Sequence, residues 1–215
     1  ESHEPGSTFK LASIMALVED GFVDIDDTVD VELGIHQYWN QTMRDAERHN
    51  LTRITVRSAF AHSSNVGISK LVEQHYNKDP EKYLSYLREL GLDKKLNIEI
   101  PGEQQPYIKD TKDKRFTRYS LPWMSVGYEI QISPLQMLTL YNSVANNGVM
   151  MKPYLVQQIQ EYGLPVQHFD PVVLNKKICS DETLQAMKII LKEVVDSGTA
   201  KNLRNPNYSV AGKTG

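Results

Sequence analysis

The chain has 215 residues, of which 40% are hydrophobic and 24% are charged, and its formal net charge is -3. This is the composition of an ordinary globular protein with enough apolar residues to bury a core, and nothing in it indicates a nucleic-acid partner. Because Cys179 is the only cysteine, an internal disulfide and a thiolate metal cluster are excluded, and Cys179 itself is expected to be a buried, small apolar residue.

Helix dominates the predicted structure, because apolar residues recur at helical spacing in six segments. The first segment, 7–20, has few polar interruptions, so we expect a largely buried helix that Gly21 caps at its C-terminal end. The other predicted helices are 55–62, 66–76, 81–90, 135–146 and 181–196.

Extended chain is predicted at fewer places. Residues 22–38 are expected to be irregular with one short strand, and the basic run 109–118 is expected to be a solvated loop because two aspartates interrupt it. No stretch of 18 apolar residues occurs, so no membrane-spanning helix is expected. The remaining predicted extended segments are 98–105, 153–160, 172–174 and 209–215.

The start of the first predicted helix carries a Ser-x-x-Lys pattern, Ser7 to Lys10. Positions i and i+3 share one face of a helix, so the Lys10 amine can reach the Ser7 hydroxyl. A lysine in an apolar helix can have its pKa lowered enough to act as a base, and the backbone N–H of Ser7 is available to a developing oxyanion. By itself the pattern is weak, because a capping serine with a solvent-facing lysine also fits it.

Two further short patterns follow in the chain. Ser63 and Asn65 form a Ser-x-Asn between two predicted helices, where serine and asparagine are also common as caps and turn residues. Lys213, Thr214 and Gly215 form a Lys-Thr-Gly in the extended run 209–215, and this tripeptide alone carries little information.

The order Ser-x-x-Lys, Ser-x-Asn and Lys-Thr-Gly resembles the signature of penicillin-binding proteins and serine β-lactamases. The segment 4–7 (EPGS), the segment 127–137 with its SPLQM, and the segments 149–153 and 195–200 also resemble class B, monofunctional penicillin-binding proteins, most closely the cell-division type. The resemblance therefore covers most of the chain. It implies an α+β fold of the β-lactamase/transpeptidase type, of which residues 1–215 would supply mainly the helical subdomain, ending at the Lys-Thr-Gly strand.

The resemblance implies peptidoglycan D,D-transpeptidation through a serine acyl-enzyme, without a metal or an organic cofactor. Ser7 would be the nucleophile, Lys10 its base and Ser63 the group that passes a proton to the departing D-alanine. Asn65 would hold the amide of the acyl chain and contact Lys10, and Lys213, Thr214 and Gly215 would bind the substrate, the first two through its terminal carboxylate. β-Lactam antibiotics would acylate the same serine.

Three alternatives remain open at this point. A class A β-lactamase would need a second carboxylate for its hydrolytic water, and no Glu-x-x-x-Asn element lies in the expected place between the second and third motifs. A β-lactam-sensing receptor domain would share the three motifs. A non-catalytic helical interaction domain would carry them by accident.

The resemblance also carries expectations about the protein around these residues. Sheet strands flanking the motifs and the second oxyanion N–H, which follows Lys-Thr-Gly, would lie outside residues 1–215, so this stretch alone is expected to be inactive. Placement outside the cytoplasmic membrane, an upstream membrane anchor and membership of a cell-wall synthesis complex are implied in the same way.

Overall fold

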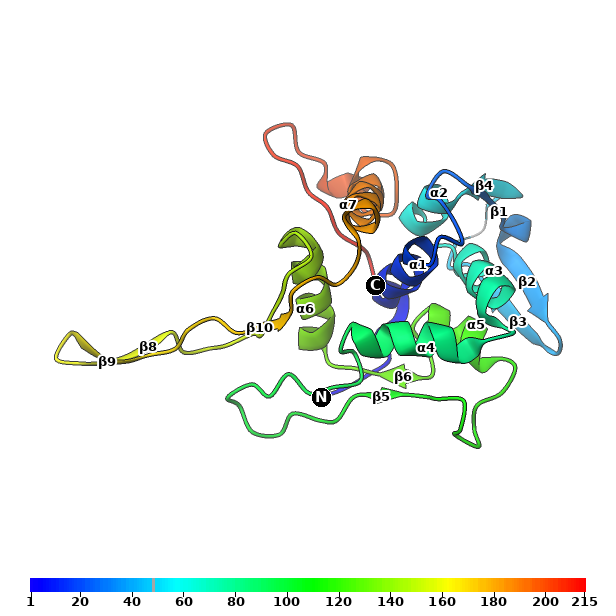
Figure 1. Cartoon of the computed structure of the whole chain (residues 1–215). Coiled ribbons are helices and arrows are strands. Elements are labelled where there is room, and N and C mark those ends of the chain that lie inside the picture. Colours follow the sequence, from blue (N-terminus) through cyan, green and yellow to red (C-terminus); the bar gives the residue numbers. More distant parts are fainter. Residues whose placement is uncertain (48) are drawn as a thin grey trace.

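The computed structural model describes residues 1–47 and 49–215, and in it helices surround a buried central helix (Figure 1). This helix, α1 (Lys10–Glu19), follows a single 3-10 turn, η1 (Gly6–Phe9). Every residue from Lys10 to Leu17 is buried, as expected of a helix that is apolar on all sides. Helices α3 (Asn65–Tyr76), α4 (Pro80–Glu89) and α7 (Asp181–Asp196) pack against it.

The remaining helices pack against α3 and α7, two of the helices that contact α1. They are α2 (Val56–Ala61), α5 (Ser120–Ser125), α6 (Pro134–Ala145) and the 3-10 turns η2 (Glu32–Gly34) and η3 (Lys201–Leu203). The six helices predicted from sequence are all present, and their boundaries differ from the prediction by at most three residues. The difference at the start of α1 arises because Ser7 lies in the 3-10 turn and not in the α-helix.

Local capping explains why the helix boundaries could be predicted. Thr55, Ser64, Ser133 and Ser180 each accept a hydrogen bond from a backbone N–H in the first turn of the helix that follows. A glycine marks the C-terminal end of α1: Gly21 has a φ of 68°, and its N–H donates to the carbonyl of Val18. A left-handed residue of this kind commonly ends a helix.

Short strands form five two-stranded antiparallel sheets within residues 1–47 and 49–215. The pairs are β1 (Thr28–Asp30) with β4 (Arg53–Thr55), β2 (Ile35–Tyr38) with β3 (Gln41–Arg44), β5 (Tyr107–Ile108) with β6 (Ile130–Gln131), β7 (Met150–Met151) with β10 (Val173–Asn175), and β8 (Gln158–Glu161) with β9 (Leu164–His168). The mixture of helices and strands agrees with the predicted α+β class.

Several strand predictions were wrong. The segment 22–38 holds two strands and a 3-10 turn, not one short strand, because β1 and β2 pair with partners further along the chain. The strand expected at 153–160 begins only at Gln158. The segment 209–215 has no strand pairing in the described structure; its backbone contact is from the Gly212 N–H to the carbonyl of Leu191 on α7, at 3.1 Å.

The predictions for Cys179 and for the basic run 109–118 had different outcomes. Cys179 is buried, as expected, and burial raises the pKa of its thiol to about 12. The run 109–118 is largely exposed beyond its first residue, but Lys109 is buried and pairs with Glu129, with 2.6 Å between Nζ and Oε2. Glu129, which is half-buried, supplies the counter-charge that a buried lysine needs.

The hairpin β8–β9 projects from the helical body as a long arm (Figure 1). Residues 154–174 are all exposed. Among the helices that the structure describes, none is both long enough and apolar enough to cross a bilayer.

Candidate active site

The turn that carries Ser7 is fixed by a close approach of two glycines. The Gly6 N–H donates to the carbonyl of Gly127 at 3.1 Å. A Cβ on Gly127 would lie 2.1 Å from the Gly6 oxygen, and Gly127 has a φ of 89°. Only a glycine fits such a position, so Gly127 sets the backbone from which Ser7 projects.

Lys10 lies at the centre of the site and is fully buried. Its Nζ donates to the Ser7 hydroxyl at 3.0 Å, to the Ser63 hydroxyl at 3.0 Å and to the Ser63 carbonyl at 2.7 Å. The first and second motifs, which are more than 50 residues apart in the chain, therefore meet at one amine.

Burial is the main reason that the pKa of Lys10 falls from 10.5 to about 7. The charge of Lys213 lowers it further, and the charge of Asp45 opposes both effects. A lysine with a pKa near neutrality is available as a base, as general acid–base chemistry requires.

The partners of Lys10 also restrict where its lone pair can point. A carbonyl oxygen only accepts, so one N–H of the neutral amine stays on the Ser63 carbonyl. The other N–H and the lone pair are then shared between the hydroxyls of Ser7 and Ser63. Neutral Lys10 can therefore accept a proton from either hydroxyl.

The second motif is a strained turn between α2 and α3. Ser63 has a φ of 58°, which is uncommon for a residue with a Cβ. Asn65 is the first residue of α3, and its Nδ2 donates to the Arg44 carbonyl at 2.7 Å. The end of β3 therefore orients the amide of Asn65, and within the described residues this amide makes no hydrogen bond to Lys10. The contact of Asn65 with Lys10 and its hold on the acyl chain stay predictions.

The third motif lies beside the first. Lys213 is half-buried, its Nζ donates to the Thr214 carbonyl at 2.9 Å, and burial lowers its pKa to about 8. The hydroxyls of Thr214 and Thr199 are 2.6 Å apart. A Cβ on Gly215 would lie 2.7 Å from the Thr8 methyl group, so Gly215 is packed against the residue that follows Ser7.

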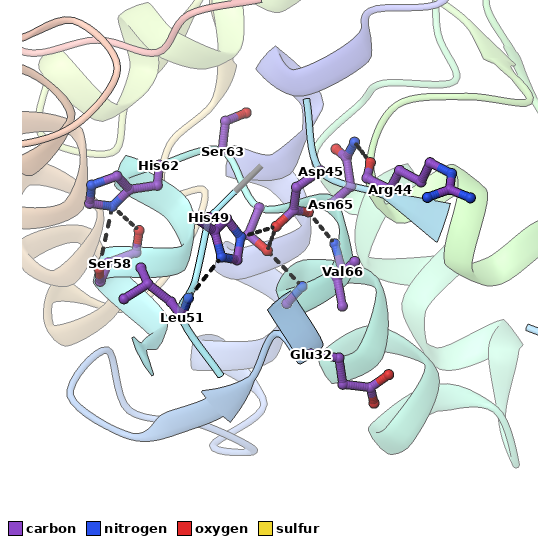
Figure 2. A network of polar contacts seen from close by, with 12 residues as sticks. Glu32, Arg44, Asp45, His49, Leu51, Ser58, His62, Ser63, Asn65 and Val66 are labelled. Carbon is purple, nitrogen blue, oxygen red and sulfur yellow. Dashed lines mark hydrogen bonds and ion pairs between the residues drawn. The ribbon is translucent and has the colours of Figure 1, made fainter. Parts of the chain in front are cut away.

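Asp45 is the residue of the site that the sequence did not reveal. Its carboxylate lies at the start of α3, beside His49 and the backbone of Val66 (Figure 2). It hydrogen-bonds the middle residue of the second motif and influences the charge of Lys10. An aspartate that precedes a Ser-x-Asn by 18 residues matches no local pattern, so no sequence signal was available.

Comparisons with known proteins agree with this geometry. A family model described as "Penicillin binding protein transpeptidase domain" matches residues 1–215. The penicillin-binding protein PbpB of Mycolicibacterium smegmatis is 30% identical over 223 residues, which cover 99% of this chain and 33% of that protein. The chain thus spans about a third of the length of this curated relative.

Solved structures give the same result for the fold. The D,D-transpeptidase domain of a peptidoglycan glycosyltransferase from Eggerthella lenta has a TM-score of 0.88 at 25% identity, covering 100% of this chain and 54% of that one. Penicillin-binding protein 3 of Mycobacterium tuberculosis, in complex with ampicillin, has a TM-score of 0.84 at 27% identity, covering 100% of this chain and 48% of that one.

Proposed function

Because this chain belongs to the penicillin-binding protein transpeptidase domain family, we propose that it carries the nucleophile of a peptidoglycan D,D-transpeptidase, and that Ser7 is that nucleophile. One observation carries the proposal: the buried amine of Lys10, with a pKa of about 7, hydrogen-bonds both Ser7 and Ser63. An amine that is half neutral near pH 7 and 3.0 Å from a hydroxyl is an activated pair for nucleophilic catalysis.

The first half of the reaction forms an ester and releases an amine. Ser7 Oγ attacks the carbonyl of the penultimate D-alanine of a stem peptide, and its proton passes to Lys10. The Ser7 N–H, in the first turn of the helix where N–H groups lack intrahelical acceptors, is placed to stabilise the oxyanion. Ser63, bonded to the same Lys10, delivers its hydroxyl proton to the departing D-alanine nitrogen and takes the proton of Lys10 in return, so the amine is neutral again.

The second half transfers the acyl group. The amine of a second stem peptide attacks the carbonyl carbon of the Ser7 ester and loses one proton through Ser63 to Lys10. The amide bond forms as the ester C–O bond breaks, and Lys10 passes that proton to Ser7 Oγ. Asn65 and the Lys213–Gly215 segment would hold the peptide, with Lys213 and Thr214 at its terminal carboxylate. The position of Gly215 against Thr8 supports this, because it places the third motif next to the nucleophile.

β-Lactams would acylate Ser7 because they resemble the D-alanyl-D-alanine end. The relative from M. tuberculosis was solved with ampicillin, which supports this extension to the present chain. Both solved relatives are about twice as long as this chain, so we propose that residues 1–215 are the helical part of a larger domain. Cross-linking outside the cytoplasmic membrane, an anchor elsewhere in the protein, a cell-division role and membership of a cell-wall synthesis complex follow as proposals from the same family assignment.

Intact-mass measurement after treatment with a penicillin tests the assignment of Ser7. We expect one adduct on the protein that contains the complete domain, its loss in Ser7→Ala, and its retention in Ser85→Ala, which removes an exposed hydroxyl on α4. Absence of an adduct on the unmodified protein, or an adduct on Ser7→Ala, would refute the assignment.

Product analysis then separates the candidate activities. Release of D-alanine from a pentapeptide together with a product joined to an acceptor amine identifies a transpeptidase. Rapid release of hydrolysed penicillin would identify a β-lactamase instead. A lasting adduct without any turnover of peptide would identify a β-lactam sensor.

A further inference from the structure

The carboxylate of Asp45 is built into the start of α3. Its side chain is only 5% exposed. Oδ1 accepts the N–H of Val66 at 2.9 Å, and Oδ2 accepts the hydroxyl of Ser64 at 2.8 Å (Figure 2). The ring Nε2 of His49 lies 2.9 Å from the same Oδ2. A carboxylate at this end of a helix also interacts favourably with the helix dipole.

Ser64 connects this carboxylate to the second motif. Its hydroxyl donates to Asp45 and accepts the N–H of Gly67 at 2.9 Å, so it caps α3 and ties it to the loop after β3. The neighbouring residue, Arg44, orients Asn65 through its carbonyl. Residues 44 and 45 therefore hold both residues that follow Ser63 in the turn.

The turn needs such support because Ser63 is left-handed. A residue with a Cβ keeps a positive φ only where its surroundings enforce it. The consequence for chemistry is direct, because the carbonyl and hydroxyl of Ser63 are two of the three hydrogen-bond acceptors of Lys10. A change in this turn changes the environment of the base.

Asp45 also acts on Lys10 by its charge. Within residues 1–47 and 49–215, the other charged group that acts on Lys10 is Lys213, and it lowers the pKa of Lys10 where Asp45 raises it. A cavity of about 280 Å³ lies beside Asp45, and its titratable lining groups are Glu47, His49, His62 and Lys201. None of them is among the charges that shift the pKa of Lys10 in the described part of the chain.

We propose that Asp45 is a positioning residue for acylation: through Ser64 and α3 it holds the carbonyl and the hydroxyl of Ser63 against Lys10. The inference rests on the proposed function of Ser7 and Lys10. The geometric part is this link through Ser64. The electrostatic part is the smaller effect of the Asp45 charge, which opposes the effect of burial on the pKa of Lys10, and two substitutions address the two parts.

Asp45→Asn tests the electrostatic part. The amide keeps the shape, and its oxygen can still accept the Val66 N–H, but the negative charge is gone. The NH2 group that replaces Oδ2 donates to the Ser64 hydroxyl instead of accepting from it, so the contact with Ser64 is kept with its direction reversed. Removing a negative charge near a lysine disfavours its protonated form. In a plot of acylation rate against pH, the acid limb, where the rate falls because Lys10 becomes protonated, therefore moves to lower pH. We expect a shift of roughly half a unit or more, smaller than the one to three units of a directly contacting charge, because the described contacts of Lys10 do not include Asp45.

Ser64→Ala tests the geometric part. It keeps the charge of Asp45 but removes the link to the turn. We expect the plateau of the acylation rate to drop roughly tenfold or more, since misplacement of catalytic groups by about 1 Å can cost about a hundredfold. The acid limb should stay close to its original pH.

Glu19→Gln is the matched control. Glu19 accepts the N–H and the hydroxyl of Ser180, the capping residue of α7, so its carboxylate plays the same structural part at the far end of α1. Gln at this position is expected to lower the unfolding midpoint and to leave both the plateau and the acid limb unchanged. The proposal would be overturned if Glu19→Gln lowered the plateau of the acylation rate as much as Ser64→Ala does, or shifted the acid limb as much as Asp45→Asn does.

The measurement is the rate of acylation by a chromogenic cephalosporin between about pH 5 and about pH 9 on the protein with its complete domain, with unfolding midpoints to show that each variant is folded. An unshifted acid limb in folded Asp45→Asn overturns the electrostatic part, and an unchanged plateau in folded Ser64→Ala overturns the geometric part. Failure of the unmodified protein to form a Ser7 adduct would instead refute the proposed function, so the two failures are distinguishable.

Discussion

The buried amine of Lys10 should destabilise the folded protein over a defined pH range. Its pKa is about 7 when folded and would return to about 10.5 when unfolded. The folded state then binds this proton more weakly than the unfolded state does. The contribution of Lys10 is therefore most unfavourable below pH 7, and the free energy of unfolding rises with pH between about 7 and about 10.5.

The size of this effect follows from the two pKa values. A difference of one pKa unit corresponds to about 1.4 kcal/mol, so the full interval is on the order of 5 kcal/mol. Lys10 has no exposed surface, so little of this is lost to solvent screening. Lys10→Met removes the titrating group and keeps the unbranched stem that fills the core.

Denaturant unfolding of both proteins at a series of pH values measures the effect. Loss of the hydrogen bonds to Ser7 and Ser63 gives Lys10→Met a constant penalty, so the informative quantity is how the stability difference varies with pH. We expect the advantage of Lys10→Met over the unmodified protein to shrink by several kcal/mol from pH 7 to pH 10. Exposed Lys95→Met controls for the loss of one positive charge. A difference that is constant with pH, or that grows, would refute the burial argument.

Three further outcomes can be checked with the same proteins. Acylation by a penicillin should be half-maximal near pH 7 and fall about tenfold per unit below about pH 6, because only neutral Lys10 accepts the Ser7 proton; stopped-flow rates give the profile. Gly127→Ala should lower the free energy of unfolding by about 3 kcal/mol or more and remove most of the acylation activity, because its Cβ would lie 2.1 Å from the Gly6 oxygen. An acylation rate equal to that of the unmodified protein would contradict this. Ser133→Ala removes the capping box of α6 and should lower the urea-unfolding free energy by about 1 kcal/mol, with acylation unchanged.

The helices and the pairing of Ser7 with Lys10 could be predicted because their signals are local. The bounds of α7 agree with the prediction at both ends, since an amphipathic period is framed by the capping Ser180 and by Ser197 and Gly198. Ser7 and Lys10 are three residues apart, so helical geometry alone brings them together, and the structure finds them 3.0 Å apart.

The features that the sequence did not reveal depend on distant partners. Strands β2 and β3 pair with each other, and β1 pairs with β4, but each strand is only three or four residues long, too short for a clear alternation. Asp45 hydrogen-bonds Ser64, which lies 19 residues away, and buried Lys109 pairs with Glu129, which lies 20 residues away. Charge and polarity along the chain cannot show which side chains fold onto each other.

The projecting hairpin has a consequence for how the protein can be modified. Its base is closed by the pairing of Met151 with Val173, and residues 154–174 beyond that closure are exposed. Insertion and shortening are best tolerated at such tips, because no core packing is disturbed. The turn at Tyr162 and Gly163 is thus a natural attachment point for a fluorophore or an affinity tag, remote from Ser7 along the chain and outside the packed body, so a label there can follow the protein without entering its chemistry.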